Sequence, residues 1–144
     1  MSKPTPQKSK RKQPTETGKA FELEFLSEFM EYTCKHQKKH YDIFIPFIDN
    51  NGIDFVIRTD NGETYKEIQV KGREPRKIFT LKTELKEHRD YWLILYCKNK
   101  KENKYDRYIL SQDDLKDNIT STGKVSKKLL TEARKERDFD DIFK

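Results

Sequence analysis

The stretch GIDFVIRTDNGETYKEIQVKG, residues 52–72, decides how the middle of the chain folds. It contains two segments rich in β-branched and aromatic residues, 53–59 and 63–71, on either side of Asp60-Asn61-Gly62. Asn and Gly tolerate positive φ angles, so an Asp-Asn-Gly segment between two such runs is typical of a tight hairpin. We therefore predict two antiparallel strands joined at residues 60–62.

One face of the second strand is predicted to be polar. Successive side chains of a strand point to opposite faces, so Glu67, Gln69 and Lys71 share one face. Ile68 and Val70 share the other. Burying an acid, an amide and an ammonium group costs several kcal/mol unless each is paired or bound to something. This row is therefore a candidate functional site.

The hairpin adds a carboxylate to this row, because it places Asp54 on the neighbouring strand, about 4.8 Å away. A carboxylate together with an amide or main-chain carbonyl oxygen can hold Mg²⁺ or Mn²⁺. A metal-bound water is a nucleophile towards phosphate, and Lys71 can assist that water or stabilise the developing charge. The pattern predicts phosphodiester hydrolysis at Asp54, Gln69 and Lys71.

A family resemblance agrees with this chemistry. Asp54, followed after the hairpin by Gln69-Val70-Lys71, resembles the D…(D/E)-x-K signature of the PD-(D/E)xK nuclease superfamily, which includes restriction endonucleases and archaeal-type Holliday junction resolvases. Gln69 stands where the signature has an acid, and some branches carry Q-x-K. Residues 18–22, GKAFE, resemble the glycine-then-glutamate opening of the family's first helix. The resemblance covers roughly residues 18–112.

The resemblance implies both a fold and an activity. The fold would be α/β with a restriction endonuclease-like core, in which helices flank a mixed central β-sheet made of a three-stranded antiparallel meander plus two strands. The activity would be that of a Mg²⁺-dependent (or Mn²⁺-dependent) endonuclease hydrolysing phosphodiester bonds of DNA. Double-stranded or branched DNA would be the substrate, and a homodimer is a common assembly in the family.

The resemblance also implies roles for individual residues. Asp54, Gln69 and Lys71 would be catalytic, and Glu22 would join them from the first helix. Glu67 lies on the same face as Gln69 and is a further candidate metal ligand. The phosphate backbone would meet a basic strand end and loop. The candidate nucleic-acid-binding residues are Lys71, Arg73, Arg76 and Lys77.

The remaining segments complete an α/β pattern. Phe21, Phe25, Leu26, Phe29 and Met30 recur at spacings of three and four, which predicts an amphipathic helix with one apolar stripe. This helix is expected over 19–34, with Thr17 as its N-cap. The other expected elements are a strand over 41–48 that is at an edge or broken at Pro46, a helix over 81–89, strands over 91–97 and 105–110, a helical turn from Ser111 and a final helix over 124–137.

Charge is concentrated at the N-terminus of this 144-residue chain, whose net charge is +6. Residues 1–19 hold six basic residues and one acid (+5), residues 124–144 hold seven and five (+2), and the middle is therefore −1. Residues 1–17 contain three prolines and no aromatic residue, so we expect a disordered basic tail before a single nuclease-like domain over 18–144. Such a tail suits a polyanion, and a solubilising tail or a localisation signal stays open.

Composition also bears on location. No apolar run approaches the ~20 residues of a membrane span, and no signal peptide is evident. Cys34 and Cys97 form no disulfide framework and are expected to be buried thiols. These features predict an intracellular, cytoplasmic protein without a membrane partner, in the nucleoid or nucleus if it is bound to DNA.

Alternative interpretations stay open. Gln69 would mark a decayed site if the domain binds nucleic acid without cutting it. The same fold would also serve an RNA-cleaving toxin or a protein-interaction domain. His36 and His40 have the i, i+4 spacing of zinc ligands, but without a third ligand a solvated basic loop is the preferred interpretation.

Overall fold

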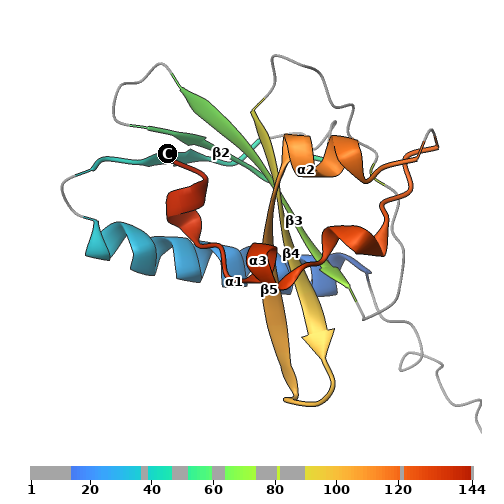
Figure 1. Cartoon of the computed structure of the whole chain (residues 1–144). Helices are drawn as coiled ribbons and strands as arrows, with labels where there is room; N and C mark the ends of the chain where they lie inside the picture. Colours follow the sequence, from blue (N-terminus) through green and yellow to red (C-terminus); the bar gives the residue numbers. More distant parts are fainter. Residues whose placement is uncertain are drawn as a thin grey trace, which may run out of the picture.

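A five-stranded mixed sheet forms the centre of the protein in its computed structural model (Figure 1). The structure describes residues 14–36, 39–46, 52–59, 64–73, 81, 90–120 and 122–143. The elements in chain order are α1 (Pro14–Lys35), β1 (Asp42–Phe44), β2 (Phe55–Arg58), β3 (Tyr65–Arg73), β4 (Tyr91–Asn99), β5 (Lys104–Ser111), α2 (Gln112–Asp117), η2 (Lys127–Leu129), α3 (Glu132–Lys135) and η3 (Phe139–Asp141).

The strand order is β1-β2-β3-β4-β5. The first three strands pair antiparallel, β3 pairs parallel with β4, and β4 pairs antiparallel with β5. The predicted meander and the two later strands are therefore confirmed, and so is the α/β class with a mixed sheet. The β2–β3 register pairs Phe55 with Ile68 and Arg58 with Tyr65, whereas the turn at 60–63 lies outside the described residues.

β1 is an edge strand, as predicted for a segment containing proline. It spans only three residues, and Pro46 follows it outside the ladder. Proline has no N–H to donate, so it is tolerated beside an edge strand rather than in a central one. The helix expected over 81–89 falls almost wholly outside the described residues.

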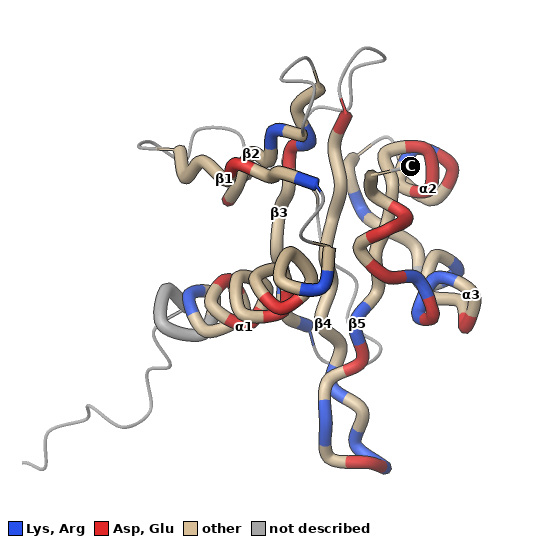
Figure 2. The backbone as a smooth tube through the Cα atoms, turned by 90° about the vertical axis from the view of Figure 1, so that its left-hand side faces the viewer, with Lys and Arg blue, Asp and Glu red and all other residues tan. Residues whose placement is uncertain are grey.

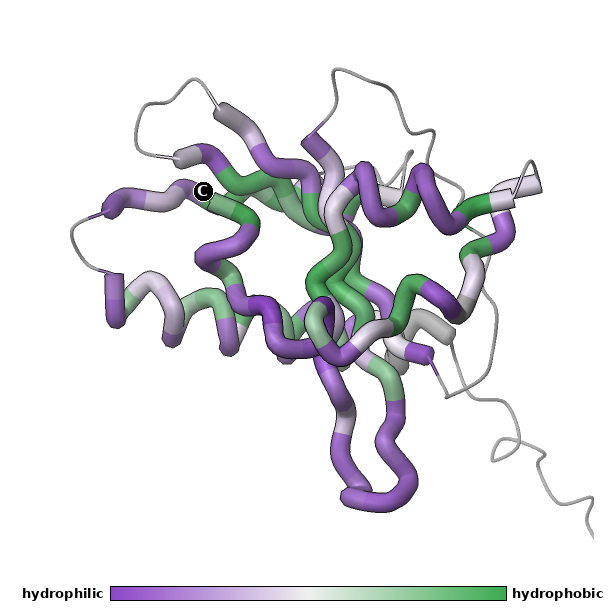
Figure 3. The backbone as a smooth tube through the Cα atoms, in the orientation of Figure 1, coloured by the Kyte–Doolittle hydropathy of each residue, from purple (hydrophilic) through white to green (hydrophobic). Residues whose placement is uncertain are grey.

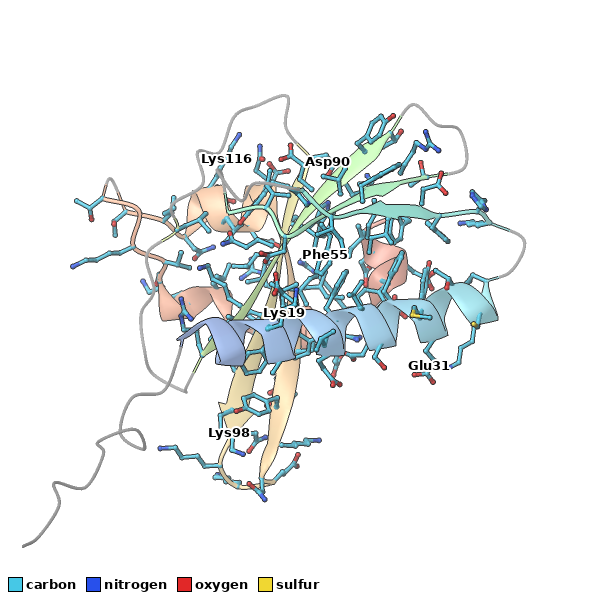
Figure 4. The ribbon with its side chains drawn as sticks, turned by 180° about the vertical axis from the view of Figure 1, so that it is seen from behind. Lys19, Glu31, Phe55, Asp90, Lys98 and Lys116 are labelled. Carbon is cyan, nitrogen blue, oxygen red and sulfur yellow. The ribbon has the colours of Figure 1, made fainter. Side chains whose placement is uncertain are left out.

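The sheet separates two hydrophobic cores. α1 lies across one face of the sheet, and α2 lies on the other side (Figures 1 and 4). Figure 4 shows Phe55 in the layer between the sheet and α1. The core under α1 is largely aromatic and includes Phe25, Phe29, Tyr32, Phe55, Ile68, Val70, Tyr96 and Phe139. The opposite core includes Tyr91, Leu93, Leu95, Leu110, Leu115, Val125 and Leu129.

α1 begins earlier than predicted. It starts at Pro14, so Thr17 lies inside the helix and is not its N-cap, and residues 14–17 do not belong to the expected tail. Proline is compatible with this start because the first helical residues have no intrahelical partner for their N–H groups. Residues 1–13 lie outside the described part of the chain.

The buried stripe of α1 also differs from the prediction. Phe25 and Phe29 are buried as expected, but Met30 is 65% exposed and the stripe continues through Tyr32. Steps of four and three residues from Phe25 lead to Phe29 and Tyr32, which keeps the stripe on one helical face. Cys34 lies off this stripe and is exposed, so its predicted burial is wrong, whereas Cys97 is buried.

Gly72 is a point of close contact between α1 and β3. A Cβ atom at Gly72 would lie 1.9 Å from a ring carbon of Phe21. The same ring stacks on Tyr96 at 5.7 Å between centroids and meets Tyr105 edge-on at 5.1 Å. The first turns of α1 are therefore packed against β3 and against the base of the β4–β5 hairpin.

The single helix predicted over 124–137 is wrong. Val125 forms an isolated β-bridge with Ile119, and the short helices η2 and α3 follow. Gly123 precedes this segment with a φ of 84°, and Thr131 caps α3 as a new start. These turns divide a segment whose apolar spacing alone is compatible with one helix.

The C-terminal segment connects the two cores. Val125 and Leu129 pack in the core beside β4, whereas Phe139 and Ile142 pack under α1. Between them, Arg137 donates to the carbonyl of Ile109 at 2.9 Å, which ties the segment to β5. Within the described residues, no helix has the length and apolar character needed to cross a membrane.

Candidate active site

Asp54 lies against the strand that carries the predicted polar row. Its N–H donates to the carbonyl of Ile68 at 2.8 Å, so the ladder extends one residue beyond the start of β2. Its Oδ2 accepts a hydrogen bond of 2.7 Å from the backbone N–H of Val70. The Asp54 carboxylate is thus held at the backbone of the residue between Gln69 and Lys71.

Gln69 is the polar residue buried in the sheet at this point, with 7% of its surface exposed. The Tyr91 hydroxyl donates a hydrogen bond to its Oε1. Gln69 pairs with Leu93 in the parallel ladder, on the face of the second core, whereas Ile68 and Val70 pack under α1. The alternation predicted for β3 is confirmed.

Glu67, Lys71 and Arg73 continue the row along the same face of β3, and all three are half-buried. The Arg73 Nη1 donates to the carbonyl of Gly72 at 2.8 Å. Burial lowers the pKa of Arg73 from its usual value, and the neighbouring Cys97 thiol opposes this shift. Two cationic side chains, Lys71 and Arg73, therefore follow Gln69 towards the end of β3.

Glu22 is separated from this row by the sheet. It is a half-buried residue of α1, the helix that covers the Ile68 face of β3. The described residues contain no group of three His, Cys, Asp or Glu side chains able to hold a metal ion, so neither Glu22 nor Glu67 completes such a group with Asp54. Arg76 and Lys77, two of the predicted phosphate contacts, lie outside the described residues.

The oxygen donors of Asp54 and Gln69 are of the chemical kind that a hard divalent cation takes. Mg²⁺ is commonly bound through one or two carboxylates and keeps several waters, which substrate phosphate can replace. Asp54 and Gln69 offer one carboxylate and one amide oxygen on adjacent strands. This row contains no histidine or cysteine, the side chains that zinc prefers.

The two histidines do not form a zinc pair on one helix, since α1 ends at Lys35. The His40 Nε2 lies 2.9 Å from Asp42, and the His36 Nε2 lies 3.9 Å from Asp140. Each histidine therefore has a different acidic neighbour. This arrangement is compatible with the prediction that His36 and His40 belong to a solvated basic loop rather than to a zinc site.

The structure also shows a polar cluster that the sequence did not reveal. Glu28 accepts hydrogen bonds from the Tyr96 hydroxyl and, at 2.6 Å, from Arg107. Burial and the Glu28 carboxylate raise the pKa of Tyr96. The cluster borders a pocket of about 750 Å³ beside the first turns of α1, which Lys104 and Tyr105 also line. This pocket is on the opposite side of the sheet from Gln69, and no short-range sequence pattern joins its α1 residues to those of β4 and β5.

Comparison with known proteins adds no relative. The chain matches no model of a known protein family, no curated protein and no solved structure.

Proposed function

We propose that this protein is a metal-dependent endonuclease that hydrolyses phosphodiester bonds of DNA, built on a restriction endonuclease-like core. The observation that carries the proposal is the hydrogen bond of 2.7 Å from the Val70 N–H to the Asp54 carboxylate. It brings a carboxylate to the strand segment that bears Gln69 and Lys71. The sequence resemblance predicts that Asp54 lies beside the Gln69–Lys71 segment, and the register between β2 and β3 supports this arrangement.

Each residue of the row has a role in the proposal. Asp54 and Gln69 would hold Mg²⁺ or Mn²⁺, which lowers the pKa of a bound water and polarises a phosphoryl oxygen. Lys71 would orient the attacking water or stabilise the charge that develops on the phosphate. Arg73, two residues further along the same face, would contact a neighbouring phosphate.

A second candidate function rests on the contact between Tyr91 and Gln69. A buried amide oxygen that accepts a hydroxyl hydrogen bond is already satisfied, and an amide is a weaker metal ligand than a carboxylate. This contact favours a nucleic-acid-binding module that retains the fold without cleavage. Its binding would persist in EDTA, fall steeply with salt and be indifferent to Asp54→Ala.

Cleavage assays with two variants of the candidate site separate these functions. Supercoiled plasmid and branched DNA would be incubated with Mg²⁺ or Mn²⁺ and either wild type, Asp54→Asn or Lys71→Ala. We expect metal-dependent nicking by wild type and at least a ~100-fold loss in each variant, the scale typical of removing one electrostatic or acid–base contribution.

Asp54→Asn is the sharper variant, because asparagine keeps an oxygen for the Val70 N–H but loses the charge that attracts a metal. Lys35→Ala is the matched control, since Lys35 is 72% exposed at the far end of α1. Thermal unfolding would confirm that every variant is folded. Equal cleavage by wild type and both site variants, or no cleavage with either metal, would reject the nuclease proposal.

A further inference from the structure

The β4–β5 hairpin extends beyond the rest of the sheet. β3 pairs with β4 only as far as Arg73 and Cys97, whereas β4 and β5 stay paired to Asn99 and Lys104. Among the strands that the structure describes, only β4 and β5 therefore continue here, as a two-stranded ribbon. Figure 3 shows this ribbon as a hydrophilic projection that leaves the apolar centre of the molecule.

The tip of this ribbon is basic. Residues 98–104, KNKKENK, hold four lysines and one glutamate, a net charge of +3. Lys104 pairs with Glu102 at 2.7 Å. Within the described part of the chain, the side chains of Lys100 and Lys101 are in no ion pair, and both residues are at the exposed turn. Figure 2 shows the positive charge along the projecting ribbon.

The ribbon is braced at its base and within its length. Phe21 contacts Tyr96 and Tyr105, and Glu28 binds Arg107 at 2.6 Å, so α1 fixes both strands where they leave the sheet. Further out, the Lys98 ammonium lies 5.1 Å from the centre of the Tyr105 ring. Figure 4 shows Lys98 on the ribbon, beyond α1. A braced ribbon presents its charges in a fixed direction.

The ribbon continues from the end of the candidate active site. Lys71 pairs with Leu95 and Arg73 with Cys97, so the cationic end of the β3 row leads towards the hairpin. Lys100 is five residues beyond Leu95, about 17 Å at ~3.3 Å per residue. That distance corresponds to about five phosphate steps along one DNA strand, at ~3.4 Å each. The row and the tip are therefore close enough to contact the same DNA strand.

We propose that the β4–β5 hairpin is a DNA-binding arm that binds the duplex about five phosphates beyond Lys71, through Lys100 and Lys101. Double-stranded DNA is the partner because its closely spaced phosphates complement a line of lysines, and because the major groove admits a two-stranded β-ribbon. The inference names the substrate contacts of the proposed nuclease and so rests on that function for its biological meaning.

The test measures binding separately from cleavage. Fluorescence anisotropy with a labelled duplex in EDTA, where hydrolysis is blocked, gives the dissociation constant over a range of salt concentrations. The arm variant is Lys100→Gln with Lys101→Gln, which removes charge at an exposed turn. The matched control is Lys35→Gln with Lys39→Gln, two exposed lysines near the other end of α1.

We expect the arm variant to bind the duplex at least ~10-fold more weakly and to lower the salt slope by about two, one for each lost phosphate contact. The control should stay within about twofold. Lys100→Glu with Lys101→Glu should weaken binding further, because repulsion replaces attraction.

If the arm variant and the control bind the duplex with equal affinity and equal salt slope, the proposal that the hairpin binds DNA is wrong, whatever the cleavage assay shows. Conversely, the arm variant could bind more weakly than wild type while wild type cuts no DNA. That result would reject the nuclease proposal and support the DNA-binding role of the hairpin. The two failures are therefore distinguishable.

Discussion

The two faces of β3 differ in how their residues are held. On the α1 face, Ile68 and Val70 lie in a core of stacked and edge-on aromatic rings. On the opposite face, Gln69 is buried with a hydroxyl partner, and Lys71 is half-buried beside it. The burial of Ile68 and Val70 on the first face is explained by hydrophobic packing. The second carries polar groups that packing does not require, and such groups are where function is to be sought.

The largest expected loss of stability follows from a change in the aromatic core on the α1 face of the sheet. Phe25 is fully buried between Phe29, Phe55 and Phe139. Phe25→Ala should lower the free energy of unfolding by about 3–5 kcal/mol, because it removes a large ring and leaves a cavity. Leu23→Ala, at a position 56% exposed on the same helix, should change it by less than about 0.5 kcal/mol. Urea denaturation measures both, and similar losses would contradict the assignment of this face.

The second prediction tests the close packing of Gly72 against the Phe21 ring on the same face. Gly72→Ala should lower the free energy of unfolding by about 1–3 kcal/mol, because its Cβ would overlap the Phe21 ring. Combining it with Phe21→Ala should cost less than the sum of the two single changes, since the smaller side chain removes the clash. Strict additivity in thermal or urea unfolding would show that Phe21 does not pack on Gly72.

A loss of stability of similar size tests the polar face through Gln69. Gln69→Leu should lower the free energy of unfolding by about 1–3 kcal/mol, because the buried Tyr91 hydroxyl loses its acceptor. Adding Tyr91→Phe should recover most of that loss, since no polar group then remains unpaired. A double variant as unstable as Gln69→Leu alone would disprove the contact. Recovery would show that Gln69 is dispensable for folding, as a residue retained for function would be.

The smallest expected effect is a pH dependence of the free energy of unfolding, caused by Asp114 beside the second core. Burial alone would raise the pKa of Asp114, but hydrogen bonds from Arg137 and Ser111 outweigh it and hold the pKa below its usual 3.8. A carboxyl group with a lowered folded-state pKa stabilises the protein above its unfolded-state pKa, and this contribution disappears as the pH falls through the folded-state pKa.

Asp114→Asn should therefore be less stable than wild type near neutral pH, and the difference should shrink below about pH 4. Urea midpoints across this range measure it. A difference that is independent of pH would show that the ion pair with Arg137, at 2.5 Å, does not govern the effect.

The sequence predicts the strands well because their signals are local. Alternation along 63–71 assigns Gln69 and Lys71 to one face, and Asp60-Asn61-Gly62 joins the strands that bring Asp54 alongside. The contact between Tyr91 and Gln69 was not predictable in this way. It depends on the parallel register of β3 and β4, which no short-range pattern specifies.

The C-terminal segment shows the opposite case. Val125 and Leu129 have a spacing compatible with one helix. Both are buried in the second core, but Val125 lies in a β-bridge and Leu129 ends the short helix η2. Tertiary burial overrides local spacing here because the segment must pass from one core to the other around β5. The charge of the hairpin tip was visible in the sequence, but its direction relative to the candidate site follows only from strand pairing.

The central claim is that Asp54 and the Gln69 strand together bind a divalent cation beside Lys71. The most direct measurement is anomalous diffraction from a crystal soaked in Mn²⁺. The account predicts an anomalous peak in contact with the Asp54 carboxylate and the Gln69 segment of β3, and no peak there in Asp54→Asn. If the site is well ordered in wild-type crystals and shows no such peak, the claim that it binds a divalent cation is wrong.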